Sequence, residues 1–297
     1  MVLFREALAL DVEKTARAGA VLAEKILQKK KGQVTLVSLA RAGTPIGILI
    51  KRYLDRKYQV CLPHYSISII RDRGIDHNAM DYILARHSRE TIQFVDGWIG
   101  KGTISRELEK EMKGYPGISP ELAVLSDPAR LTDLYGTSED FLIPSACLNA
   151  PVSGLFSRTV LNDRLIGPGD FHGAVYYRDM EGCDVSYEFI HMVEQYFPGL
   201  DGKAEPEERR AVTGREEAVQ IRDAFGISQL NYIKPGIGET TRVLLRRIPW
   251  KVLVRDREDL ENVGHILRLC QEKEVEVEEY PLVNYKACGL IKELSDV

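Results

Sequence analysis

Residues 93–105 read Gln-Phe-Val-Asp-Gly-Trp-Ile-Gly-Lys-Gly-Thr-Ile-Ser, and this stretch decides the fold class. An apolar run ends in the acid Asp96, a loop with three glycines follows, and Thr103 stands where a helix would begin. Glycines allow backbone N–H groups to curl around an anion, and a helix N-terminus adds the positive end of its dipole. The pattern predicts a strand–turn–helix that holds a ribose 5′-phosphate, with Asp96 at the sugar hydroxyls. The alternative is an ordinary turn in which Thr103 caps the helix.

Short β-rich runs alternate with amphipathic segments on both sides of this stretch, which predicts an α/β fold with a parallel sheet and crossover helices. Strands are expected at 34–39, 60–70, 91–96 and 122–125, and helices at 11–30, 46–56 and 103–112. Residues 1–200 form the predicted first domain, and the charged residues 201–224 a linker or exposed helix. Residues 225–297 form a predicted small α/β domain: a loop at 234–239, helices at 240–247 and 260–270, strands at 251–254 and 275–280, and a final helical segment.

Composition excludes several classes of protein. The 297 residues are 44% hydrophobic and 28% charged, as in globular proteins, and the net charge of −4 argues against a generally basic nucleic-acid coat. No apolar run approaches the ~20 residues that span a bilayer, and the acidic N-terminus does not resemble a signal peptide. Five scattered cysteines without a C-x-x-C pair indicate neither a zinc ribbon nor a disulfide framework. We therefore expect a soluble cytoplasmic protein with no membrane partner.

Two motifs resemble those of type I phosphoribosyltransferases. Residues 94–103 resemble the family's phosphoribosyl-diphosphate motif, and residues 34–47 its pyrophosphate loop. The resemblance implies that family's helix-flanked parallel sheet, with Asp96 at the ribose and Arg41, Ala42, Gly43 and Thr44 facing the diphosphate. It also implies ligand contacts by Gly97, Ile99, Gly100, Lys101, Gly102 and Thr103. Gly97 replaces the second acid that the family usually has at this place.

A cluster of charged residues lies between these two motifs. Arg71, Asp72, Arg73, Gly74, Asp76, His77 and Asn78 fall within eight positions. The resemblance places the family's mobile lid here, and Arg71 and Arg73 would then neutralise the diphosphate. The alternative is a solvated loop before a helix. The same resemblance implies Mg²⁺ bound through the diphosphate rather than through a metal site of the protein.

Cys147 and His172 lie in the irregular residues 140–185, which are rich in Gly, Pro, Ser and Asn. They could form a thiolate–imidazolium pair, with Asp170 or Asn149 orienting the histidine. The alternative is that Cys147 is a small buried hydrophobic residue. If the protein is a transferase, the acceptor pocket for a nucleobase-like substrate would be lined by Ser145, Asn149, Ser153, Arg158 and His172.

The sequence from 234 to 257 is basic, with seven positive and two negative side chains. Its beginning, Lys-Pro-Gly-Ile-Gly-Glu-Thr-Thr-Arg, resembles the glycine loop and helix start with which Pelota-type domains bind structured RNA. The resemblance implies RNA contacts by Lys234, Gly236, Gly238, Glu239, Thr240, Arg242 and Arg246. The alternative is a solvated helix face.

The whole chain resembles a bacterial family that joins a phosphoribosyltransferase-like region to a Pelota-type domain. That family is associated with tellurite-resistance and stress gene clusters, and is also named as StiP-type cysteine proteases. Three functions remain open. The first is a transferase that uses phosphoribosyl diphosphate and Mg²⁺ on an unknown acceptor, which the Pelota-type domain would link to RNA. The second is a cysteine protease using Cys147 and His172, and the third is a non-catalytic sensor of a ribose phosphate with an RNA-binding domain.

Overall fold

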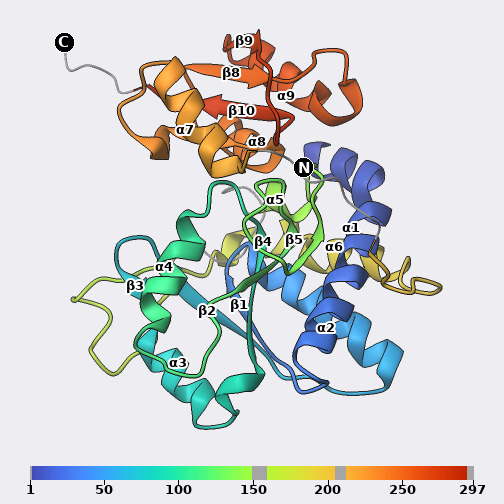
Figure 1. Ribbon diagram of the computed structural model, residues 1–297, viewed down its shortest axis with the longest axis vertical. Coiled ribbons are helices and arrows are strands. Elements are labelled where there is room, and N and C mark those ends of the chain that lie inside the picture. Colours follow the sequence, from blue (N-terminus) through green and yellow to red (C-terminus); the bar gives the residue numbers. More distant parts are fainter. Residues whose placement is uncertain (1, 149–158, 205–211, 293–297) are drawn as a thin grey trace.

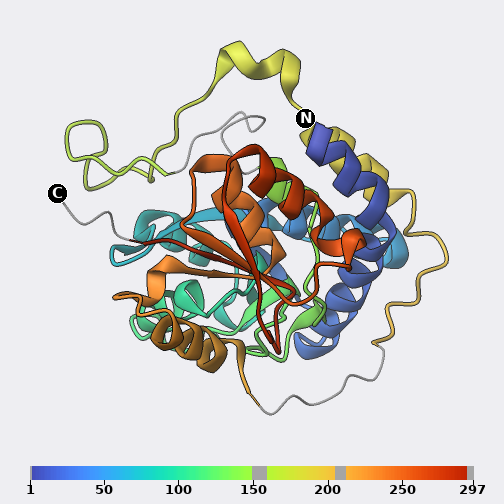
Figure 2. The ribbon, with the colours of Figure 1, turned by 90° about the horizontal axis from the view of Figure 1, so that it is seen from above.

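The chain forms two α/β units, each built on its own sheet. The computed structural model describes residues 2–148, 159–204 and 212–292. In Figure 1 the first unit (blue to green) lies below, and the second (orange to red) lies across its upper end. Figure 2 shows that residues 159–184, in yellow-green, run along the outside of the molecule. Asn149, Ser153 and Arg158 lie outside the described residues.

The first sheet has six strands in the order β3-β2-β1-β4-β5-β6, all parallel except β3. The strands are β1 Thr35–Ala40, β2 His64–Ile70, β3 Gly74–Ile75, β4 Ile92–Trp98, β5 Leu122–Ser126 and β6 Tyr135–Thr137. The chain runs from β1 outward to β2 and then returns to the other side of β1 at β4. Such a reversal leaves a crevice at the carboxyl ends of β1 and β4, where open α/β sheets bind ligands.

Helices cover both faces of this sheet because successive strand residues point to opposite sides. Leu36 and Val95 pack with α1 and α2 on one face, while Val37, Leu39 and Phe94 pack with α3 and α4 on the other. The helices of this unit are α1 Val2–Lys29, α2 Gly43–Tyr58, α3 His77–Leu84, α4 Thr103–Met112, α5 Ser145–Leu148 and α6 Ser186–Glu194, with 3₁₀ turns at Arg89–Thr91 and Arg178–Cys183. The expected helix-flanked parallel sheet is confirmed, while its assignment to the phosphoribosyltransferase fold stays a prediction.

The second sheet has the order β7-β10-β8-β9, in which β8 and β9 are parallel and β10 runs antiparallel to β7 and β8. The elements of this unit are α7 Gly214–Ala224, a 3₁₀ turn at Leu230–Tyr232, β7 Ile233–Pro235, α8 Ile237–Arg246, β8 Lys251–Val254, α9 Leu260–Glu272, β9 Glu276–Glu279 and β10 Ala287–Leu290. The predicted final helical segment is wrong, because residues 287–290 form a central strand in which all four residues are buried. A run of four apolar residues is too short for its periodicity to distinguish helix from strand.

Helix α7 belongs physically to the second sheet. It begins with a capping box in which Thr213 and Glu216 bond each other's backbone N–H groups. Its buried face, which includes Ala218 and Ile221, packs in the core of the second unit. Residues 214–224 are therefore a docked helix with one buried face.

Buried hydrogen bonds join the two units. The carboxylate of Asp140 accepts the backbone N–H of Ile237 at 2.9 Å and that of Lys286 at 2.8 Å. In the other direction, the Tyr285 hydroxyl donates to the Gly100 carbonyl, and Lys101 Nζ donates to the Ile233 carbonyl at 2.8 Å. These bonds hold the glycine loop of the first unit against the second. Within the described ranges, no helix combines the length and apolar character needed to cross a membrane.

Candidate functional site

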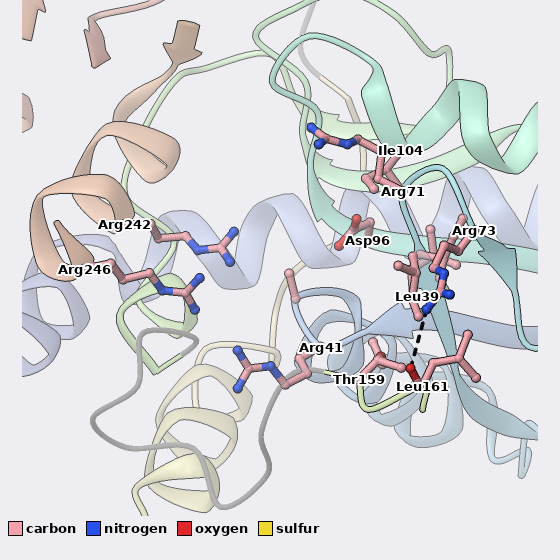
Figure 3. A pocket seen from close by; sticks show the side chains of 14 residues that line it. Leu39, Arg41, Arg71, Arg73, Asp96, Ile104, Thr159, Leu161, Arg242 and Arg246 are labelled. Carbon is pink, nitrogen blue, oxygen red and sulfur yellow. Dashed lines mark hydrogen bonds between the residues drawn. The ribbon is translucent and has the colours of Figure 1, made fainter. Parts of the chain in front are cut away.

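A cleft lies where the carboxyl ends of β1 and β4 face helix α8 (Figure 3). Its first compartment, about 530 Å³, is lined by charged residues of both units: Arg41, Arg71, Arg73, Asp96, Arg242 and Arg246. Its second compartment, about 580 Å³, is lined by residues 98–105 together with Asn231, Lys234, Pro235 and Glu239, among others. The compartments share Ala42, Ile70, Arg71, Asp96, Ile104, Arg242 and Arg246, so they meet beside Asp96.

The turn after β1 forms the floor of the first compartment. The Ala40–Arg41 peptide bond is cis, and Arg41 extends into the cleft (Figure 3). Gly43 lies directly on β4, where a Cβ atom would stand 2.3 Å from the Val95 carbonyl oxygen, so any side chain would clash. Thr44 bonds to Ser66 Oγ at 2.8 Å. Of the four residues predicted to face a diphosphate, Arg41 and Ala42 line the cleft, whereas Gly43 allows the close packing beneath it.

Among the described residues that line the first compartment, Asp96 is the single carboxylate. Its Oδ1 accepts the Gly97 N–H at 2.7 Å. Burial raises the pKa of Asp96 to about 7, against the opposing effects of that N–H and of the Arg242 charge. A carboxyl group with a pKa near neutrality can hold or release a proton at physiological pH, and such groups concentrate at functional sites.

The glycine loop borders the second compartment through Ile99, Gly100, Lys101, Gly102 and Thr103. Gly102 has a φ of +73°, a left-handed conformation that starts α4 at the required angle. Lys101 is buried and bonds to the Ile233 carbonyl, and its burial lowers its pKa to about 8. Lys101 thus ties the loop to the second unit as well as lining the cleft.

Arg71 and Arg73 reach the cleft from the turn between β2 and β3 (Figure 3). Two carboxylates of α4 hold this turn: Glu107 accepts the Asp72 N–H at 3.0 Å, and Glu111 accepts the Ile75 N–H at 3.4 Å. The position of the turn is therefore set by the helix that follows the glycine loop. The other predicted lid residues have partners elsewhere: His77 bonds to the Tyr115 hydroxyl, and Asn78 bonds to the carbonyls of Pro168 and Asp170.

Helix α8 brings the basic residues of the second unit into the same cleft. Arg242 and Arg246 extend from α8 towards Arg41 and Asp96 in Figure 3. Arg242 also lies over the Trp98 ring at 5.4 Å and pairs with Glu239 at 3.5 Å. Burial alone would raise the pKa of Glu239, but four neighbouring cations lower it: Arg242, Lys101, Lys234 and Arg246. The site predicted for a ribose phosphate and the edge predicted for RNA are therefore one cleft.

Three residues predicted to contact RNA are packed inside the structure. Gly238 contacts Trp98, and the backbone of Gly236 lies against Asp140, whose carboxylate occupies the Ile237 N–H. Thr240 is buried and bonds to the Lys234 carbonyl and the Gly289 N–H. The N–H of Ile237 at the start of α8 is therefore occupied by a carboxylate of the first unit.

Cys147 and His172 do not form a ready catalytic pair. Cys147 is buried in the core with Ser145 beside it in α5, and burial raises the pKa of its thiol to about 12. His172 instead bonds through Nδ1 to Ser68 Oγ at 2.9 Å, and its backbone N–H donates to Asp76 at 2.6 Å. The Asp170 carboxylate, expected to orient His172, accepts the Gly167 N–H within its own turn. The two side chains therefore have separate partners.

Sequence reasoning missed several residues of the site. Trp98, Ile104 and Leu161 line the cleft, while Glu107 and Glu111 support the arginine-bearing turn. Trp98 is the last residue of β4, directly before the loop that leads to α4. Glu107 and Glu111 are spaced one helical turn apart, but their partners in the turn could not be known without the tertiary structure.

The described part of the chain contains no group of three His, Cys, Asp or Glu side chains that could hold a metal ion. Mg²⁺ keeps several waters and commonly binds one or two carboxylates together with the phosphates of a substrate. The cleft offers Asp96 as such a carboxylate beside its arginines. This donor set fits a Mg²⁺ ion that arrives with a phosphorylated ligand, and does not fit a metal held by the protein alone.

Comparison with known proteins assigns both units. The model of a family described as the tellurite-like stress resistance cysteine protease StiP matches residues 1–194, and a Pelota RNA-binding domain model matches residues 212–293. The curated cysteine protease StiP of Acinetobacter baylyi is 32% identical over 311 residues, which cover 98% of this chain and 81% of that protein. The chain therefore belongs to the StiP family and carries a Pelota RNA-binding domain.

Proposed function

We propose that the protein is a cysteine protease of the StiP type, with Cys147 as its nucleophile. The observation that carries this proposal is the similarity to a relative named as a cysteine protease, which extends over 98% of the chain. In such a reaction the thiolate attacks a peptide carbonyl, the amine leaves, and water releases the acyl group. Cys147 is the candidate that the resemblance to StiP-type cysteine proteases implies. It lies on α5, which contacts helix α8 of the RNA-binding unit as well as α1 and α6.

The surroundings of Cys147 define what activity requires. With a thiol pKa of about 12, only ~10⁻⁵ of the groups are thiolate at pH 7. The nucleophile is thus protected in this conformation, and catalysis requires a rearrangement that exposes it. Movement of α8 relative to α5 would provide such a rearrangement, and α8 also carries the arginines of the cleft.

The test is digestion of fluorescently labelled, unfolded casein by the full chain and by three single variants. We expect Cys147→Ser to lose activity, while Cys61→Ser and Cys183→Ser retain it as controls at exposed cysteines. Activity that survives in Cys147→Ser, or digestion that is absent from the unmodified protein with and without RNA, would overturn the proposal.

We propose a second function for the cleft, which is to bind a phosphorylated ribose such as phosphoribosyl diphosphate. The arrangement of Asp96 beside arginines from two units at the carboxyl ends of β1 and β4 supports it. Asp96 would accept hydrogen bonds from the ribose hydroxyls, and Arg41, Arg71 and Arg73 would hold the diphosphate. Mg²⁺ bound to the phosphates and to Asp96 would add positive charge there.

The same geometry would support phosphoribosyl transfer. An acceptor nitrogen would form a bond to the anomeric carbon while the carbon–oxygen bond to the diphosphate breaks, and the arginines would stabilise the charge that accumulates on the leaving group. Gly97 stands where the transferase motif usually has its second acid. A protein that binds the ligand without turnover, the non-catalytic sensor of the sequence analysis, is therefore the alternative to the transferase. Pyrophosphate release distinguishes the two.

Calorimetry with phosphoribosyl diphosphate, with and without Mg²⁺, tests the second function. We expect Mg²⁺-dependent binding that is lost in Asp96→Asn and Arg41→Ala. The matched control is Arg17→Ala, because Arg17 is exposed on α1 and paired only locally with Glu13. Unchanged affinity in both cleft variants would refute this function.

A further inference from the structure

We infer that the cleft receives the 3′ end of a single-stranded RNA, so that one strand contacts both units. The terminal ribose would lie at Asp96, with its 2′ and 3′ hydroxyls bonded to the carboxylate. The terminal nucleotide would occupy the first compartment and the penultimate nucleotide the second. The inference rests on the ribose-phosphate binding proposed above, and it specifies the chemical class of the ligand.

The size of the cleft indicates a ligand larger than one sugar phosphate. Small-molecule sites are typically about 300–1,000 Å³. Each compartment, at about 530 and 580 Å³, is of that size by itself. Because they meet beside Asp96 and Arg242, one chain-like ligand can pass from one compartment into the other.

The charge distribution indicates more than one phosphate group. Cations stand on opposing walls: Arg41, Arg71 and Arg73 on the first unit, and Lys234, Arg242 and Arg246 on the second. The carboxylates among the lining residues are Asp96 and Glu239, and cations on both units lower the pKa of Glu239. Successive phosphodiesters of a strand would meet cations on both walls.

The packing of the second unit directs an RNA ligand into the cleft. Asp140 occupies the Ile237 N–H, and Trp98 covers Gly238, so the start of α8 faces the first unit instead of solvent. RNA that contacts Arg242 and Arg246 of α8 would therefore lie in the cleft between the units. Single-stranded RNA is bound by stacking bases on aromatic and guanidinium planes, and Trp98 with Arg242 over its ring supplies such a surface.

Asp96 selects a free 3′ end of RNA over other ends. A carboxylate accepts two hydrogen bonds from a cis pair of hydroxyls, and only the 3′-terminal ribose of RNA has both hydroxyls free. DNA lacks the 2′ hydroxyl, and a 3′-phosphate would place a negative charge against Asp96. The preceding phosphodiester would then lie between Arg242 and Arg246.

The experiment measures binding of a 5′-fluorescein five-nucleotide oligoadenylate to the full chain by anisotropy. Three probes are compared: RNA with a free 3′ end, the same RNA with a 3′-phosphate, and the DNA of the same sequence. We expect the free RNA to bind at least tenfold more tightly than either alternative, and Asp96→Asn to remove this preference. Arg242→Ala should weaken all three probes, and Arg17→Ala should weaken none.

The affinities of the unmodified protein for the three probes test the inference without any variant, so they do not depend on whether a variant folds. Equal binding of the three probes, or tighter binding of DNA, would overturn it. Phosphoribosyl diphosphate is then added as a competitor. If it binds by calorimetry but does not displace the RNA, only the RNA inference fails, whereas the absence of binding by both ligands removes the ribose-phosphate function as well.

Discussion

The cleft between the units and the surroundings of Cys147 differ in charge and in exposure to solvent. Among the residues that the structure describes, seven cations and two carboxylates line the cleft, which is open to solvent. Cys147 lies in the apolar core, where burial outweighs the effects that would stabilise a thiolate and raises the pKa of the thiol. In this conformation the charges of the cleft suit an anion, whereas the thiol of Cys147 is not activated for attack on a peptide bond. The proposed proteolysis therefore requires a change in the surroundings of Cys147.

The largest expected effect is in thiol reactivity. At pH 7, the thiolate fraction of Cys147 is ~10³-fold below that of an exposed thiol with an ordinary pKa of about 8.5. Iodoacetamide should therefore label the exposed Cys61 and Cys183 long before Cys147, as followed by mass spectrometry of peptides. Early labelling of Cys147 would mean that its thiol is accessible and activated, which would contradict its burial in the core.

Charge reversal in the cleft should come next. Arg242→Glu adds a carboxylate near Asp96 and Glu239. We expect affinity for phosphoribosyl diphosphate and for RNA to fall by ~10² or more, since a partly buried contact between opposite charges is replaced by repulsion. Calorimetry and anisotropy measure this loss, and Arg17→Glu on α1 is the control for net charge. Retained binding would show that the ligand does not touch α8.

Asp96→Asn should increase the stability of the fold at high pH although it removes ligand binding. The pKa of Asp96 is raised to about 7 in the folded state, from about 3.9 in an unfolded chain. The protonated carboxyl therefore contributes to the free energy of unfolding below about pH 3.9, and this contribution is lost as the pH rises through 7. The amide of asparagine stays neutral and avoids this loss. Relative to the unmodified protein, we expect the free energy of unfolding of the variant to be higher by on the order of 1–2 kcal/mol at pH 8 and to be equal at pH 4. Urea denaturation at both pH values measures it. A variant that is less stable at pH 8 would indicate that Asp96 serves the fold rather than a ligand.

The smallest effect should come from the support of the arginine-bearing turn. Glu107→Ala removes the acceptor for the Asp72 N–H, and we expect ligand affinity to fall a few-fold because Arg71 and Arg73 are less well positioned. Glu107→Gln retains an acceptor oxygen and should restore most of the affinity. Equal affinity in both variants would show that the turn does not depend on α4.

Local patterns predicted much of the first unit. The strand of residues 34–39 and the strand–turn–helix around Asp96 follow from apolar runs, glycines and a helix start that lie next to one another in the sequence. Strand β10 could not be predicted, because its four residues adopt the strand conformation by pairing with β7 and β8, which are distant in the sequence. The pairing of Cys147 with His172 stays a prediction: in this structure Cys147 is buried in α5 and His172 bonds to Ser68. Local sequence patterns could not show these separate partners, because tertiary packing decides which side chains meet.

By itself, the sequence determined the α/β class, the acid and glycines at the end of β4, and the basic character of residues 234–257. Only the tertiary structure decided that Arg242 and Arg246 face Asp96 across one cleft and that the thiol of Cys147 is protected. The physical reason is that strand ends place their residues by local geometry, whereas the contact between the units depends on buried bonds from Asp140, Lys101 and Tyr285 to distant parts of the chain.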